Sequence, residues 1–166
     1  IILLFGGGFA LAKGFQESGL SDWVGAHFSD LEGAPPVVLI GVISLTITFL
    51  TELTSNTATT EMILPLLASI AVAAKIHPLL LLIPAALSAS FAFMMPVATP
   101  PNAIIFASGR IKVAQMVKAG IIINLIGVTT ITALFLLLGP TIFEIDPENL
   151  PEWVVPVDSE AQAKPQ

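Results

Sequence analysis

TSNTATT, at residues 54–60, is a small polar segment set inside a long apolar run, and MPVATPPN, at residues 95–102, is another. Inside a membrane, no water is present to satisfy loose backbone N–H and C=O groups. Irregular backbone at that depth is therefore tolerated only where it is buried in protein or lines a cavity. Two such segments in one short chain predict a binding site near the midplane of a bilayer.

The composition places the chain among integral membrane proteins. Of its 166 residues, 55% are hydrophobic and 11% are charged, whereas soluble domains carry about 25% charged residues. The formal net charge of −6 is not distributed evenly along the chain, because half of the acidic residues lie from Glu144 onward. Without cysteine, the chain has no disulfide framework and no Cys-based metal site. We predict an all-α, multi-pass protein of the plasma (cell inner) membrane, with the lipid bilayer as a partner and no nucleic-acid partner.

The beginning of the chain predicts two helical segments. Residues 1–17 are interpreted as the end of a transmembrane helix, and the missing basic region before them indicates the C-terminal part of a larger protein rather than a signal peptide. Residues 18–33 carry an apolar stripe that includes Trp23, opposite acidic residues, which predicts an amphipathic helix at the membrane–water boundary. A helix packed on protein at the same level fits this pattern as well.

A re-entrant hairpin is predicted over residues 34–75. The apolar run from Pro36 to Leu50 gives about 22 Å of helix, which is short for a hydrocarbon core of about 30 Å. The second arm, from Met62 to Ala74, is also too short. Two short arms around the polar tip favour a hairpin that enters and leaves on one side. Two ordinary spans joined by a surface loop are the alternative.

A broken transmembrane helix is predicted over residues 76–110. A helix is expected from Leu79 to Met95, and it ends there because Pro96, Pro100 and Pro101 lack N–H groups and push the preceding residues out of the α region. Apolar residues resume at 103–107. The loop ATPPN at 98–102 is therefore the break.

The charges around the last helix predict the orientation. Residues 111–143 are expected to form the last transmembrane helix, and the basic Arg110–Lys118 region precedes its apolar part. The positive-inside rule places that region in the cytoplasm. It follows that the acidic, Pro-rich tail at 144–166 lies outside, with the C-terminus, and that the hairpin enters from the outer face.

The two breaks offer complementary chemistry. At the hairpin tip, one arm ends in carbonyls with partial negative charge and the other begins with amides of partial positive charge. A small cation such as Na⁺ would take oxygens from Ser55, Asn56 and the carbonyls before them, including that of Thr54. A carboxylate would take donors from a second set, which is Asn56, Thr57, Thr99 and Asn102. The proline break adds the Ala98 and Thr99 carbonyls. No basic residue lies near, so a bound polyanion would need cations beside it.

Three other polar residues lie within the apolar segments. Glu61 is expected in the first turn of the second arm, where the helix dipole favours a carboxylate. The role of Glu52 stays open, although an acid inside a membrane is a functional candidate. Asn124 is expected to make an interhelical hydrogen bond.

Ser-Asn-Thr at 55–57 and Thr-Pro-Pro-Asn at 99–102, in this order and spacing, resemble the divalent anion:sodium symporter family of sodium-coupled di- and tricarboxylate transporters. The likeness covers Gly6 to about Phe143. It is closest over LSASFAFMMPVATPPNA at 87–103, which is more similar to the carboxylate branch than to the sulfate branch. The resemblance implies a dimeric, elevator-type transporter built from two inverted repeats, of which this chain holds one.

The resemblance also implies roles for individual residues. By the family pattern, Ser55, Asn56 and Ala98 help to form a sodium site. Asn56, Thr57, Thr99 and Pro100 would contact the substrate carboxylate. The implied activity is sodium-coupled uptake of C4-dicarboxylates or citrate by alternating access, with Na⁺ as the coupling ion.

Other functions remain open. A sodium-independent dicarboxylate exchanger or a sulfate transporter of the same fold would use the same segments. A membrane subunit without a transport role would keep both breaks as packing defects. An enzyme is not expected, since no His pair or nucleophile–base pairing is visible in the sequence.

Overall fold

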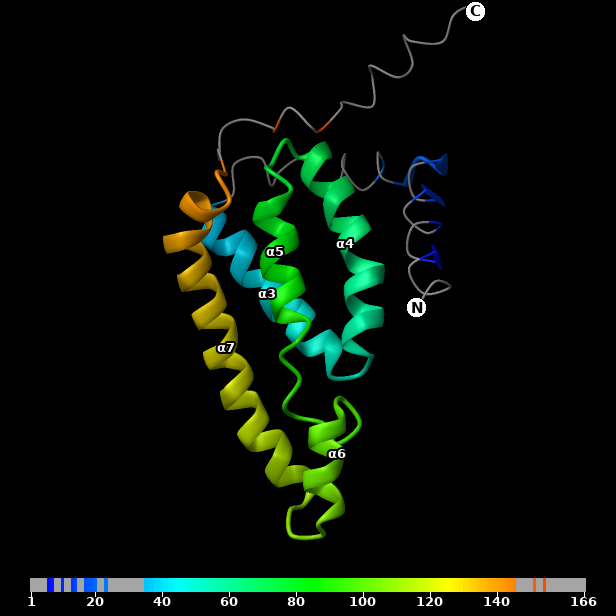
Figure 1. Cartoon of the computed structure of the whole chain (residues 1–166), viewed down its shortest axis with the longest axis vertical. Coiled ribbons are helices and arrows are strands. Elements are labelled where there is room, and N and C mark those ends of the chain that lie inside the picture. The colour runs from blue at the N-terminus through cyan, green and yellow to red at the C-terminus, as the bar shows by residue number, and fades with distance from the viewer. Residues whose placement is uncertain are drawn as a thin grey trace, which may run out of the picture.

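The computed structural model describes residues 35–145, together with scattered positions on either side of them (6, 7, 10, 13, 14, 17–20, 23, 151 and 154). Within this part of the chain, every regular element is an α-helix. The segments expected at residues 1–17, 18–33 and 144–166 fall almost entirely outside the described residues. The fold of the described part is shown in Figure 1.

Five helices make up the central part of the chain. In order they are α3 (Pro36–Thr51), α4 (Asn56–Ala73), α5 (Leu79–Ser88), α6 (Pro100–Ala107) and α7 (Val113–Ile142). In Figure 1, α3 and α5 lie beside one half of α7, with α4 beyond them, and α6 lies near the other half.

A tight turn at residues 52–55 joins α3 to α4. Helix α3 begins with Pro36 in its first turn, where the missing N–H costs nothing, and α4 begins at Asn56. The polar segment 54–60 is therefore helical from Asn56 onward, and only Thr54 and Ser55 belong to the turn. The expectation for Glu61 was wrong in this respect, because no acidic residue occupies the first turn of α4 and Glu61 lies in the second.

Helix α5 ends earlier than the sequence predicts. It stops at Ser88, and the chain is unwound from there to Thr99, so the expected helix up to Met95 is wrong in its last seven residues. The prolines that define the break in the sequence lie further on. Another contact must therefore hold the backbone open from residue 89 onward.

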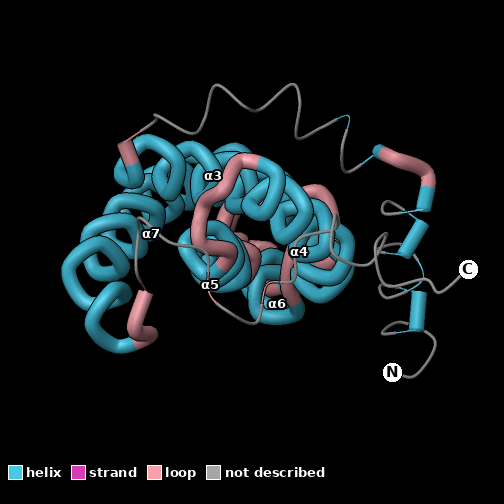
Figure 2. Tube along the Cα trace, turned by 90° about the horizontal axis from the view of Figure 1, so that it is seen from above, coloured by secondary structure: helices cyan, strands magenta, loops and turns pink. Residues whose placement is uncertain are grey.

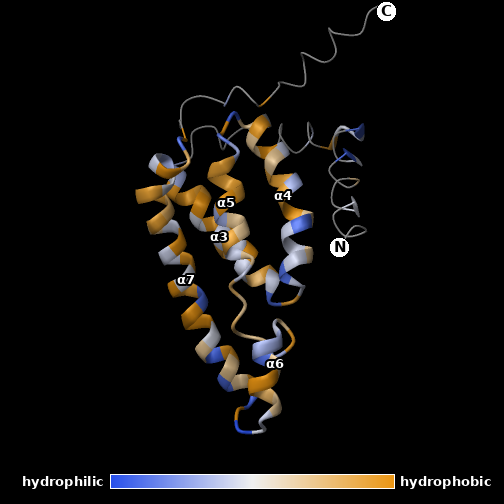
Figure 3. Ribbon diagram, in the orientation of Figure 1, coloured by the Kyte–Doolittle hydropathy of each residue, from blue (hydrophilic) through white to orange (hydrophobic). Residues whose placement is uncertain are grey.

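Helix α7 runs alongside the other described helices and is 30 residues long. Among the described residues it is the one helix both long and apolar enough to cross a membrane. At 1.5 Å per residue it extends about 45 Å. Apolar residues make up most of its length, whereas the α3–α4 turn and the α6–α7 connection are mostly polar (Figure 3).

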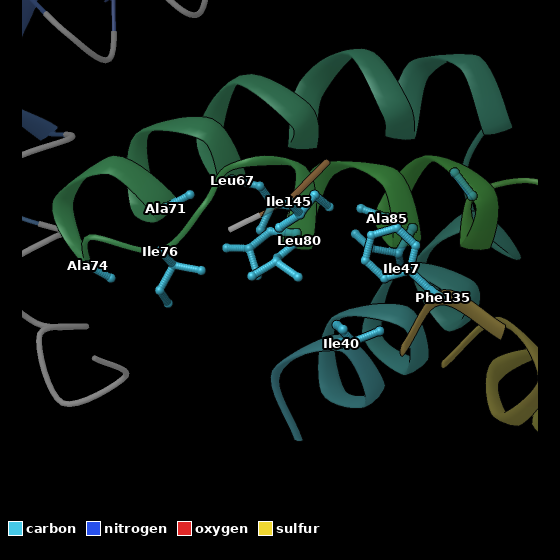
Figure 4. Close-up of a cluster of buried hydrophobic side chains, with 12 residues drawn as sticks. Ile40, Ile47, Leu67, Ala71, Ala74, Ile76, Leu80, Ala85, Phe135 and Ile145 are labelled. Atoms are coloured by element: carbon cyan, nitrogen blue, oxygen red, sulfur yellow. The ribbon is translucent and has the colours of Figure 1, made fainter. Parts of the chain in front are cut away.

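The apolar core fills the half of the molecule that contains α3, α4 and α5. Viewed from above, α4 and α7 lie on opposite sides, with α3 and α5 between them (Figure 2). Figure 4 shows the core side chains, which come from α3, α4, α5 and α7 and from residues just beyond the ends of these helices. They include Ile40, Ile47, Leu67, Leu80, Ala85, Phe135 and Ile145. This core leaves the N-terminal half of α7 to be covered by the unwound segment.

Candidate functional site

The turn between α3 and α4 places two helix ends side by side. Thr54 Oγ1 donates to the Leu50 carbonyl at 3.0 Å, which also accepts from the backbone N–H of Leu53. Thr54 Oγ1 also contacts Thr59 Oγ1 on α4. At the other side of the turn, Ser55 is the N-cap of α4, but its side chain makes no capping hydrogen bond. The first-turn amides of α4, residues 56–58, therefore remain available as donors at an exposed helix end.

A second contact ties the tip to the end of α5. Thr51 Oγ1, fully buried, lies 2.8 Å from Asn56 Oδ1 and 2.9 Å from the Ala89 carbonyl oxygen. One hydroxyl has one proton for these two acceptors. The Thr51 hydroxyl therefore shares its proton between Asn56 Oδ1 at the tip and the Ala89 carbonyl at the end of α5.

The carboxylate of Glu52 holds the unwound segment after α5. Its Oε1 accepts from the backbone N–H groups of Phe93 at 2.7 Å and Met94 at 2.9 Å. Its Oε2 accepts from the N–H of Met95 at 3.0 Å. In a continuous helix these three amides would bond to carbonyls four residues earlier. Glu52, which is 3% exposed, takes them instead, and this keeps residues 93–95 out of a helix.

A glycine-lined face of α7 receives the same segment. Gly120, Asn124 and Gly127 lie on one side of the helix, at intervals of four and three residues. A Cβ atom on Gly120 would stand 2.5 Å from the Phe93 carbonyl oxygen, and one on Gly127 would stand 2.3 Å from the Phe91 ring. Between the glycines, Asn124 Nδ2 donates to Glu52 Oε1 at 2.7 Å. The extended backbone thus packs directly on α7, and the hydrogen bond expected of Asn124 is present.

The proline break leaves carbonyl oxygens without partners. The carbonyls of Pro96 and Val97 would find prolines four residues on, at 100 and 101, which have no N–H to give. The Asn102 amide, which would serve Ala98, donates to Thr99 Oγ1 at 3.4 Å. Within the described residues, none of these three carbonyls receives a backbone hydrogen bond. Such oxygens suit a hard cation.

The side chain of Asn102 stabilises the break through hydrogen bonds to the backbone of the unwound segment. Its Nδ2 donates to the carbonyls of Ala92 at 2.8 Å and Met95 at 3.0 Å. The side chain is buried, and it is the one buried residue of α6. Both amide protons of Asn102 are thus engaged by the loop itself, so that its oxygen is the atom left for a ligand. Its assignment to substrate binding stays a prediction.

The predicted residues fall into two groups. Thr54, Ser55, Asn56 and Thr57 lie at the tip, and Ala98, Thr99, Pro100 and Asn102 lie at the break. Ser55 and Thr57 are exposed, and Asn56, Ala98 and Thr99 are half-buried. The contacts of Thr51 and Glu52 connect the two groups. The nearest basic residue along α4 is Lys75, about 27 Å from its first turn.

Sequence reasoning missed how the two groups are held together. Glu52 was singled out as an acid within an apolar run, but its partners are 41 to 43 residues away and could not be read from spacing. Gly120 and Gly127 carried a signal, because glycines seven residues apart share a helix face. No group of three His, Asp or Glu residues that could hold a metal occurs in the described part of the chain. A cation here would therefore bind hydroxyl, amide and carbonyl oxygens.

Comparison with known proteins gives consistent results. The model of a family described as the sodium:sulfate symporter transmembrane region matches residues 1–145. The chain is 49% identical over 146 residues to the sodium-dependent dicarboxylate transporter SdcS of Staphylococcus saprophyticus, covering 88% of this chain and 28% of that protein. It is 48% identical over 153 residues to human Na(+)/dicarboxylate cotransporter 3, covering 92% and 25%. It is 46% identical over 153 residues to the rat Na(+)/citrate cotransporter, covering 92% and 26%. The chain thus spans about a quarter of the length of these relatives.

Proposed function

The chain belongs to the sodium:sulfate symporter, or divalent anion:sodium symporter, family of helical membrane proteins, and from that premise we propose that it forms one half of the substrate pathway of a sodium-coupled carboxylate transporter. The proposed substrates are C4-dicarboxylates or citrate, with Na⁺ as the coupling ion. One observation carries the proposal: Glu52 fastens the hairpin tip to the break, so that free amides and free carbonyls are held at one place.

The depth of this place supports a site inside the bilayer. Asn124, which contacts Glu52, is the twelfth residue of α7 and lies about 16 Å from its start. The α4–α5 turn packs with Ile145, just beyond the other end of α7. The α3–α4 hairpin thus opens toward the C-terminal end of α7 and turns back partway along it, as a re-entrant hairpin would. We propose that this open end, and the C-terminus, lie outside the cell.

The chemistry of the two groups supports ion coupling. A sodium ion would be held by the oxygens of Ser55, Asn56 and Ala98, with that of Thr54 in reach of the same turn. A substrate carboxylate would accept from the first-turn amides of α4 and from Thr57 and Thr99, against the Pro100 ring. Neither the tip nor the break contains arginine or lysine, although Arg110 lines a groove with Asn102, so helix ends and bound cations would offset most of the charge of a di- or trianion. Substrate binding then requires sodium.

The packing supports a moving unit. Glu52, Asn124 and the glycine face of α7 join the hairpin, the break and α7 through direct contacts. Such a unit would travel as one body during alternating access, which is the elevator mode of transport. The full-length protein would be a homodimer in the plasma membrane, in which the unit moves relative to a fixed part.

The decisive experiment uses the full-length protein in proteoliposomes. Uptake of labelled succinate and citrate is measured with a gradient of Na⁺ and with an equal gradient of K⁺, and sulfate is offered in parallel. We expect uptake of a carboxylate that depends on Na⁺. Equal uptake in K⁺ would indicate an exchanger, and uptake of sulfate alone would indicate the sulfate transporter named in the family description.

A pair of variants connects this activity to the tip. Thr57→Ala removes a hydroxyl at the exposed end of α4 and should weaken carboxylate uptake. Ser69→Ala is the control. It removes a hydroxyl from the same helix, about three turns from Thr57, and that hydroxyl donates to the Pro65 carbonyl. Wild-type uptake in the Ser69 variant and loss in the Thr57 variant would support the site, whereas equal effects would not.

A further inference from the structure

A groove of about 420 Å³ lies between α6, the first half of α7 and the unwound segment. Its wall is mostly apolar and includes Ile105, Ile111, Met116, Ala119 and Ile123. Its volume lies in the range of ligand sites, roughly 300–1,000 Å³. Phe93 of the unwound segment and Asn102 of the break also line it, whereas no residue of the hairpin tip does, so the groove adjoins the break and not the tip. We call it the α6–α7 groove.

One end of the α6–α7 groove is cationic. Arg110 and Gln115 line it, and Gln115 Oε1 accepts from the Lys112 N–H, which turns the Gln115 NH₂ group outward. The sequence has no Asp or Glu between Met62 and Phe143. Within the described residues, Arg110 has no carboxylate partner, since the ion pair found there joins Lys13 to Glu17. An apolar groove therefore ends on an uncompensated guanidinium.

The two ends of the groove lie at different depths. Arg110 precedes the first residue of α7, and Ile123 lies about 15 Å further along that helix. With α7 across a bilayer, Arg110 reaches the headgroup level and Ile123 lies among acyl chains. Beside the groove, Ile122 and Ile126 of α7 are each 61% exposed, which suits a face turned to lipid. The groove thus has the polarity of a membrane lipid, with its charge at the interface.

We propose that the α6–α7 groove binds an anionic phospholipid, with its phosphate on Arg110 and the Gln115 amide and one acyl chain against Ile111, Met116 and Ile123. A basic pocket between helices at the membrane surface recognises such headgroups. The lipid also provides a packing partner for α6, which buries only Asn102 in the described chain. The inference rests on the proposed position of α7 across the bilayer, but not on the transported anion.

The test is native mass spectrometry of the full-length protein in detergent, titrated with phosphatidylglycerol and with phosphatidylcholine of the same acyl chains. We expect retention of phosphatidylglycerol in preference to phosphatidylcholine. Arg110→Gln should weaken phosphatidylglycerol binding about tenfold, the lower end of the range for a lost hydrogen bond to a charged group. Lys118→Gln, which removes the same charge outside the groove, should leave it within about twofold by the same reasoning. Identical affinities in these two variants would overturn the proposal.

A second pair tests the acyl chain. Ala119→Phe fills the groove and leaves Arg110 in place, so phosphatidylglycerol should be lost. Ala133→Phe adds the same ring to an exposed position of α7 outside the groove and should have no effect. Equal retention of both lipids by the wild type, as expected if the rest of the protein fills the groove, would also overturn the proposal. The measurement needs no transport, so a protein that retains the lipid but fails to take up carboxylates would refute only the proposed function.

Discussion

Oε1 of Glu52 lies 2.7 Å from Nδ2 of Asn124, although 72 residues separate them in the chain. The first residue follows the C-terminal end of α3, and the second lies within α7. Between them runs the unwound backbone, whose amides at 93–95 bond to the same carboxylate. One side chain therefore connects the hairpin, the break and the long helix, and its loss should affect all three.

The first prediction concerns this carboxylate. Glu52→Gln keeps the size of the side chain but replaces one acceptor oxygen with an NH₂ group that faces backbone N–H groups. Asn124→Ala removes one hydrogen bond to a charged group, worth about 1.5–3 kcal/mol. We expect both variants of the full-length protein to unfold at lower temperature and Glu52→Gln to lose uptake. Thr132→Ala is the control, because its buried hydroxyl has no partner in the described chain. Equal unfolding temperatures for Glu52→Gln and Thr132→Ala would contradict the prediction.

The second prediction concerns the glycine face of α7. The Cβ of Gly120→Ala would stand 2.5 Å from the Phe93 carbonyl oxygen and 2.6 Å from Met94 Cα, both backbone atoms that cannot turn aside. We expect the variant to be destabilised and inactive. Gly41→Ala on α3 meets nothing within 4 Å, and it should stabilise the protein by about 0.5–1 kcal/mol because alanine favours a helix. Thermal unfolding of both variants in detergent measures the contrast. A Gly120 variant as stable as the wild type would show that the break does not pack on α7.

The third prediction separates the tip residues by role. Ser55 lies at the turn beside the carbonyl end of α3, so Ser55→Ala should shift sodium activation to higher concentration. Thr57 lies in the amide end of α4, so Thr57→Ala should raise the KM for substrate by about ten- to a hundredfold. Asn56→Ala should do both. Sodium and succinate titrations in proteoliposomes give the ranking, which matters more than single values because the two ligands are linked. A larger sodium shift in Thr57→Ala than in Ser55→Ala would reverse the assignment.

The fourth prediction concerns topology. Lys75 lies in the α4–α5 turn and Arg110 in the α6–α7 connection, at opposite ends of α7 (Figure 1). Because this chain has no cysteine, a single one can be introduced at either position in a full-length protein made cysteine-free. An impermeant thiol reagent should label Lys75→Cys from outside intact cells and Arg110→Cys only after permeabilisation. Labelling of both from the same side would contradict this topology, because the broken helix between them would then not cross the membrane.

The helical class and both polar interruptions could be predicted from the sequence, because prolines and a polar run within apolar segments leave a local signal. The extent of the break could not. Helix α5 ends at Ser88, well before Pro96, and the amides at 93–95 are taken by Glu52 from a distant part of the chain. The start of α4 was missed for the opposite reason. Its first turn is polar, so the apolar periodicity begins at Met62 while the helix begins at Asn56.

Asn102 shows the same limit at the level of a single side chain. Its residue type suggested a donor for a carboxylate, and nothing in its neighbours shows that Ala92 and Met95 already occupy both amide protons. The choice between ligand and backbone partner depends on how the loop folds. The hydrogen-bond partner of Asn102 therefore depends on the tertiary structure and cannot be predicted from the spacing of residues in the sequence.

The paired prolines at 100 and 101 have a lasting consequence for motion. Because neither has an N–H, the carbonyls of Pro96 and Val97 cannot regain helical partners in any conformation of the chain. A regular helix from Leu79 to Ala107 would therefore leave these two carbonyls without backbone partners, which disfavours the winding of this segment into one continuous rod.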